Sequence, residues 1–125
     1  MPKPLGHQMD RRPLSEWEYI ALSDAMAQPW RLVYGIMWET GGRLADVLTL
    51  RREALDDPYL RVSDSLLNDL NTFLLGLHRQ RIFARGNRET PYTEQAAHAA
   101  LKAAAVKAGV RRSVHPDLYR RGRPG

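Results

Sequence analysis

Two consecutive glycines, at positions 41 and 42, divide the most apolar part of this chain into two segments. The segment before them, residues 30–38, is apolar on nearly every face of a helix, which is typical of a helix at the centre of a core. Glycine ends such a helix at little cost because it reaches positive φ without a Cβ clash. Arg43 follows directly, and apolar residues then recur at helical spacing. The sequence therefore predicts a helix, a tight turn and a second helix that begins at Arg43.

The charge of Arg43 is unfavourable at the start of a helix. It opposes the positive end of the helix dipole by roughly a few tenths of a kcal/mol. A bound anion beside Arg43 would remove this conflict, and such local misfits are typical of functional sites. The alternative is an ordinary helix corner with a solvated arginine.

Capping signals predict three further helices. Ser15 and Glu18 form a capping box at the start of the first of them. The side chains expected on its buried face are Trp17, Ile20, Ala21 and Met26. The next helix follows Ser63 and extends to about residue 77, and Thr93 caps a long alanine-rich helix that ends at Gly109. We therefore expect a mainly α single domain over residues 14–125, preceded by a flexible N-terminal arm over residues 1–13.

Composition excludes several classes of site. The chain has no cysteine, so neither disulfides nor thiolate metal sites can form. Its four histidines are scattered without metal-ligand spacing, and no glycine-rich phosphate loop is present. No cofactor is therefore expected. There is also no apolar run of membrane-spanning length and no leader-like start, which predicts a cytoplasmic protein that is not bound to a membrane.

Positive charge is concentrated in the second part of the chain. Residues 1–77 hold 8 Lys and Arg against 11 Asp and Glu, whereas residues 78–125 hold 11 against 3. A basic half in which arginine predominates suits forked contacts with phosphate groups. The asymmetry favours a nucleic-acid partner, and a solvated basic surface is the alternative.

One segment resembles a box of the tyrosine recombinases, or phage integrases, with Asp46 in place of that family's glutamate. The segment is Thr40-Gly41-Gly42-Arg43-Leu44-Ala45-Asp46-Val47-Leu48-Thr49-Leu50. The resemblance implies a truncated, recombinase-like helical catalytic fold with at most a small β element. It also implies that Arg43 binds a backbone phosphate.

The chain departs from this family where catalysis requires particular groups. No lysine occurs between Lys3 and Lys102, so the family's catalytic lysine and its hairpin have no counterpart. In the last segment, Tyr119 takes the place of the family's second arginine, while His115 and Arg120 are each displaced by one residue. The chain ends before the family's nucleophilic tyrosine. The resemblance therefore implies a protein that is not an enzyme.

The expected function is binding of double-stranded DNA without strand cleavage, by a regulatory or accessory factor of a plasmid or other mobile element, for example in transcription regulation. The helix over residues 93–108 would approach the bases, and packing of that helix on the core with a polar outer face is the alternative. The candidate DNA-binding residues are Arg43, Arg88, Thr93, Gln95, His98, Lys102, Arg111, Arg112, His115, Tyr119, Arg120 and Arg121. Two rival functions stay open: a recombinase fragment completed in trans by another chain, and an interaction protein that docks on an intact recombinase or on itself.

Overall fold

The structure, a computed structural model, describes residues 11–121. Most of the arm predicted over residues 1–13, and the last four residues of the predicted domain, lie outside this range. The elements are α1 (Glu16–Ala25), α2 (Trp30–Thr40), α3 (Leu44–Leu48), a 3-10 helix η2 (Arg52–Asp56), α4 (Asp64–Leu74), α5 (Glu94–Ala108) and α6 (Asp117–Arg121). Within residues 11–121 there is no sheet, and only two isolated β-bridges occur. The prediction of a mainly α fold is confirmed.

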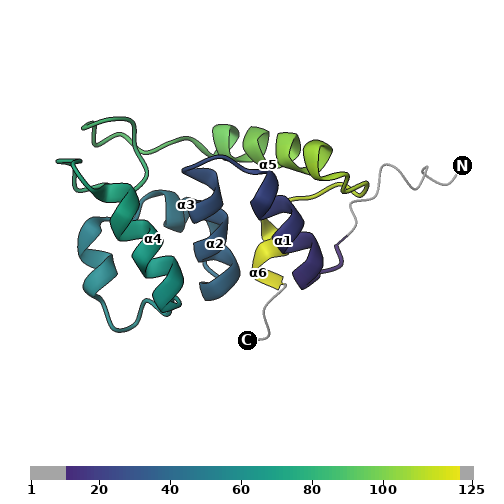
Figure 1. Cartoon of the computed structure of the whole chain (residues 1–125), viewed down its shortest axis with the longest axis horizontal. Coiled ribbons are helices and arrows are strands. Elements are labelled where there is room, and N and C mark those ends of the chain that lie inside the picture. Colours follow the sequence, from purple (N-terminus) through teal and green to yellow (C-terminus); the bar gives the residue numbers. More distant parts are fainter. Residues whose placement is uncertain (1–10, 122–125) are drawn as a thin grey trace, which may run out of the picture.

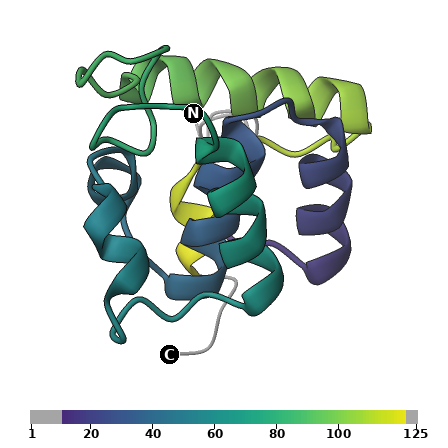
Figure 2. The same ribbon diagram turned by 60° about the vertical axis from the view of Figure 1, so that its left-hand side comes forward.

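The helices are arranged around α2. It contacts α1, α3, α4, α5 and α6, so it occupies the centre of the core. The long helix α5 lies along one side of the helical domain in both views, and it contacts α1, α2 and α3 (Figures 1 and 2). The short helix α6 packs on α2. Elements from both ends of the chain therefore meet at the central helix.

The central position of α2 follows from its sequence. Every residue from Leu32 to Trp38 is buried, as its apolar character on all faces predicts. Gly41 ends the helix in the left-handed conformation, at φ 75°, which a residue with a Cβ adopts only with strain. Arg43 then takes extended backbone angles and caps the start of α3. The predicted helix, turn and helix are confirmed.

Helix α1 begins as predicted but buries a different face. The reciprocal capping box of Ser15 and Glu18 is present. Trp17 and Ile20, however, are 68% and 50% exposed, whereas Leu22 is fully buried. The prediction was therefore wrong for Trp17 and Ile20, while Met26 is buried as predicted. The residues that meet the core are Leu14, Tyr19, Leu22 and Met26. This second apolar stripe also has helical spacing, and Tyr19 stacks on Trp38 of α2 with ring centroids 4.5 Å apart.

Of the two remaining predicted helices, α5 agrees with the prediction at both ends, and α4 differs only in where it ends. Thr93 accepts a hydrogen bond from the backbone N–H of Ala96, and Gly109 ends α5 at φ 73°, as predicted. Helix α4 ends at Leu74 rather than near residue 77. There the guanidinium of Arg52 donates hydrogen bonds to the carbonyls of Leu74 and Leu77, which takes the place of another helical turn. No helix within residues 11–121 has the length and apolar character needed to cross a membrane.

A partly buried ion pair joins α1 to the segment before α6. The guanidinium of Arg112 donates to both carboxylate oxygens of Glu18, at 2.9 and 3.0 Å, and the two side chains are 11% and 19% exposed. The hydrogen bond from Arg112 holds the pKa of Glu18 below its ordinary value. Arg112 also donates to the carbonyls of Arg12 and Pro13. This arginine therefore stabilises the fold.

The ion pair predicts an acid-sensitive contribution to stability. Glu18→Gln keeps the capping function but removes the charge, so it should lower the free energy of unfolding at pH 7 by about 1–3 kcal/mol. A carboxyl whose pKa is lowered by folding stabilises fully above its unfolded pKa, about 4.3, and loses this effect as the pH falls through its folded pKa. The difference between wild type and Glu18→Gln should therefore shrink below about pH 4.3. Urea unfolding between pH 3 and 7 measures it, and equal stabilities at pH 7 would contradict the role of the pair.

Candidate functional site

A hollow of about 330 Å³ lies where α3, α5 and α6 begin. Four of the predicted DNA-binding residues line it: Arg43, His98, His115 and Arg120. These residues come from three helices and the segment before α6. The fold therefore brings together side chains that are up to 77 positions apart in the sequence.

The two arginines of this hollow are held differently. Arg43 is exposed at the start of α3, and its guanidinium has no hydrogen bond or ion pair to any residue between 11 and 121. Arg120 donates from Nε to the carbonyl of Gly41, at 2.9 Å. That bond fastens α6 to the turn that precedes Arg43. Arg120 thus positions the turn, while Arg43 is available to a ligand.

The two histidines of the hollow contact each other. The rings of His98 and His115 lie edge to face with centroids 5.1 Å apart. The Nδ1 atom of His115 accepts a hydrogen bond from the backbone N–H of Asp117, at 3.1 Å. A neutral His115 therefore carries its proton on Nε2, which can donate to an acceptor such as a phosphate oxygen.

Two carboxylates also line the hollow, and sequence reasoning did not place them there. Glu94 begins α5, and Asp117 lies 3.8 Å from Nδ1 of His115. With neutral histidines the two guanidinium charges face two carboxylate charges. Because these charges balance, the hollow should bind a small free anion only weakly. It suits a phosphate that belongs to a larger molecule and accepts hydrogen bonds from the guanidinium and the rings. Within residues 11–121 no group of three or more His, Cys, Asp or Glu side chains could hold a metal ion.

Tyr119 does not belong to this site. Its side chain is fully buried, against Tyr34 at 4.6 Å between ring centroids and against Tyr19 at 6.0 Å. Burial raises the pKa of its phenol well above the ordinary value, and its hydroxyl has no hydrogen-bond partner among residues 11–121. This placement is at odds with the predicted DNA contact, because α6 turns Leu118 and Tyr119 toward the core. The phenol is equally unsuited to act as a nucleophile.

The other candidates are distributed over two further places. Gln95 and Lys102 are exposed on α5, and Arg111 is exposed after its end. Thr93 accepts the backbone N–H of Ala96 as the cap of α5 but stays exposed, so its predicted DNA contact stays a prediction. The guanidinium of Arg112 is engaged in the pair with Glu18, which is at odds with its predicted DNA contact. The backbone of Arg121 ends α6, and its side chain lies outside the described part of the structure.

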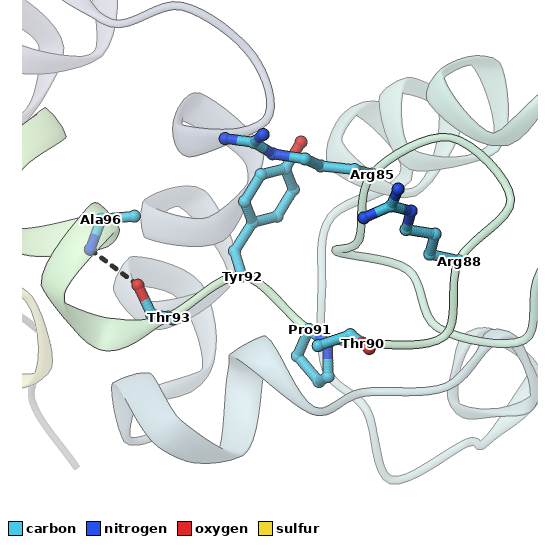
Figure 3. A pocket seen from close by; sticks show the side chains of 7 residues that line it. All are labelled: Arg85, Arg88, Thr90, Pro91, Tyr92, Thr93 and Ala96. Carbon is cyan, nitrogen blue, oxygen red and sulfur yellow. Dashed lines mark hydrogen bonds between the residues drawn. The ribbon is translucent and has the colours of Figure 1, made fainter.

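Arg88 lies at a second hollow, of about 290 Å³, between the loop over residues 85–91 and the first turn of α5 (Figure 3). Arg85 and Tyr92 also line it. Sequence reasoning missed Arg85, although the run Arg85-Gly86-Asn87-Arg88 identified the loop itself. The available signal was the pairing of two arginines across a turn.

Several basic residues of the second half of the chain have structural roles. Arg79 is 2% exposed and donates hydrogen bonds to three backbone carbonyls of its own loop. Arg81 donates to the carbonyl of Thr49. The positive charge counted from the sequence is thus not all available to a partner. Between residues 78 and 120, the exposed cations are Arg85, Arg88, Lys102, Lys107 and Arg111.

Comparison of the chain with protein-family models, with curated proteins and with solved structures gave no match.

Proposed function

We propose that the protein binds double-stranded DNA without cleaving it, as a regulatory or accessory factor of a mobile element such as a plasmid. The observation that carries this proposal is the gathering of Arg43, His98, His115 and Arg120 around one hollow. Arg43 supplies an exposed guanidinium for a backbone phosphate, and the histidines supply ring N–H donors beside it. The resemblance to tyrosine recombinases gives Arg43 the same role.

The exposed stripe of α5 supports an approach to the bases. Ala97, Leu101, Ala104 and Ala105 bury one side of the helix. Beside this buried side Gln95, His98, Lys102 and Val106 follow one another at helical spacing, and all four are exposed. The neighbouring Ala99 and Ala103 are small, so the helix can lie close to a groove. A glutamine in this stripe can read adenine, and a lysine can meet guanine or a phosphate.

The chemistry of the hollow favours binding over strand cleavage. None of the residues that line it is a serine, threonine, tyrosine, lysine or cysteine. The tyrosine nearest in sequence, Tyr119, is enclosed by aromatic side chains and its pKa is raised by burial. Within residues 11–121, the lining of this hollow therefore supplies neither a hydroxyl nucleophile nor a lysine acid.

Two substitutions separate phosphate contact from base reading. Arg43→Ala should weaken binding to all duplexes alike and lower the slope of log affinity against log salt by about one. Gln95→Ala should cost about 1–3 kcal/mol on a preferred site, selected from a random duplex pool, and little on random DNA. Fluorescence anisotropy at several salt concentrations measures both effects.

Arg61→Ala is the matched control, because Arg61 is also exposed but lines a different hollow with Trp38 and Val62. Thermal melts must first show that all variants are equally folded. An equal effect of Gln95→Ala on preferred and random duplexes would contradict the groove assignment of α5. An Arg43→Ala protein with wild-type affinity would contradict the phosphate role.

A further inference from the structure

The hollow beside the first turn of α5 has the composition of an anion site. We propose that Arg85 and Arg88 together bind one phosphate group of the DNA backbone, in addition to the contact at Arg43. This inference rests on the proposed function, since DNA supplies the phosphate. It concerns a separate place on the surface, because the two hollows have no lining residue in common.

The loop that carries the two arginines is fixed by its own side chains. The buried guanidinium of Arg79 donates to the carbonyls of Arg81, Ile82 and Gly86. The side-chain oxygen of Asn87 accepts the backbone N–H of His78, at 2.8 Å. A turn closes between Arg85 and Arg88, with the N–H of Arg88 donating to the carbonyl of Arg85 at 3.0 Å. These bonds fix the backbone that carries the two arginines before a ligand binds, so the loop backbone itself need not be ordered on binding.

Neither arginine is neutralised by the protein. Within residues 11–121, the guanidiniums of Arg85 and Arg88 form no hydrogen bond or ion pair with another residue. The carboxylate adjacent in sequence, Glu89, is occupied elsewhere: it accepts the backbone N–H groups of Gln80 and Arg81 at 2.9–3.1 Å. These bonds hold the pKa of Glu89 below its ordinary value, so it stays anionic in that role. No carboxylate lines the hollow.

The shape and chemistry of the hollow fit a phosphate with an attached sugar. Figure 3 shows Arg85 extending past the Tyr92 side chain, with Arg88 further along the same loop. Tyr92 is held in place by an edge contact with Trp30, at 5.1 Å between ring centroids. Pro91, Tyr92 and Ala96 contribute an apolar wall to the lining, and Arg85 and Arg88 contribute two positive charges. Guanidinium forks match phosphate oxygens, and the apolar wall suits a deoxyribose.

The location agrees with a backbone contact that flanks the groove. Thr93, the cap of α5, lines the hollow, and Gln95 follows within the first turn of the helix. A helix that inserts its first turns into the major groove has backbone phosphates beside those turns. The arginine pair would therefore fix the register in which Gln95 meets the bases.

The test compares the double variant Arg85→Ala/Arg88→Ala with Arg61→Ala on a random duplex, by anisotropy between 50 and 200 mM salt. Loss of one charge-assisted phosphate contact should weaken binding about tenfold at 50 mM salt and lower the salt slope by about 0.9. Arg61→Ala should leave affinity and slope unchanged. A double variant that binds like wild type overturns the arginine site while the proposed function stands.

A second arm titrates inorganic phosphate against the 15N-labelled protein. Shifts of the backbone amides of residues 85–96, absent in the double variant, support a phosphate site. Failure of the wild type to bind any duplex at 50 mM salt contradicts the proposed function. If the phosphate shifts persist in that case, the hollow binds a free phosphate group instead of DNA, and without those shifts the arginine site is overturned as well.

Discussion

Arg79→Ala should destabilise the protein by about 2–4 kcal/mol and release the loop over residues 78–91. Arg79 is the one charged side chain within residues 11–121 that is almost fully buried, at 2% exposure. Its guanidinium satisfies three backbone carbonyls and lies 5.8 Å from the ring centroid of Phe73. Alanine leaves those carbonyls without donors and opens a cavity beneath the loop. The loss should appear in urea unfolding and as faster hydrogen exchange of the amides of residues 80–91.

Arg85→Ala is the matched control for this substitution. It also replaces an arginine of this loop by alanine, but Arg85 is exposed and its guanidinium forms no hydrogen bond within residues 11–121. Its effect on stability should stay within about 0.5 kcal/mol. An Arg79→Ala protein as stable as the control, with unchanged exchange in the loop, would show that Arg79 does not hold it. If Arg79 does hold the loop, its loss should weaken DNA binding as much as loss of both Arg85 and Arg88.

Helices with local start and stop signals could be predicted from the sequence. Ser15 with Glu18, Thr93, and the glycines at 41 and 109 all act as expected, because capping depends on residues within one turn of the helix end. The buried position of α2 was also predictable, because a helix that is apolar on all faces is stable only when it is surrounded by the core.

Features decided by tertiary packing could not be predicted. Two apolar stripes compete on α1, and only the position of α2 and α5 decides that Trp17 stays exposed while Leu22 is buried. Likewise, the burial of Arg79 depends on carbonyls of a loop that has no regular hydrogen-bond pattern. An arginine in a basic run usually indicates a solvated surface, so this role of Arg79 could not be predicted.

Of the candidate site, only the position of Arg43 at the start of a helix could be predicted from the sequence. The turn before Arg43 placed that residue at the beginning of α3, as expected. On α6, neighbouring side chains point in directions about 100° apart. A shift of one position therefore decides whether a side chain faces solvent or the core. Tyr119 falls on the core side, while Arg120 reaches the turn at Gly41. The contributions of Glu94 and Asp117 to the hollow required the fold to be known.

Salt concentration should change the affinity for DNA more than any of the substitutions above. Each phosphate neutralised by a lysine or arginine releases counterions, so log affinity falls by about 0.9 for each unit of log salt. The exposed cations at the two hollows and along α5 provide for about four to six such contacts. Raising the salt concentration from 50 to 200 mM should therefore weaken binding of a random duplex by roughly two to three decades.

Anisotropy of a fluorescent random duplex, titrated with the wild-type protein across this salt range, tests the central claim most directly. The predicted result is a linear fall of log affinity against log salt with a slope of about −3.6 to −5.4. Absence of binding at 50 mM salt, or binding that does not change between 50 and 200 mM, would contradict it.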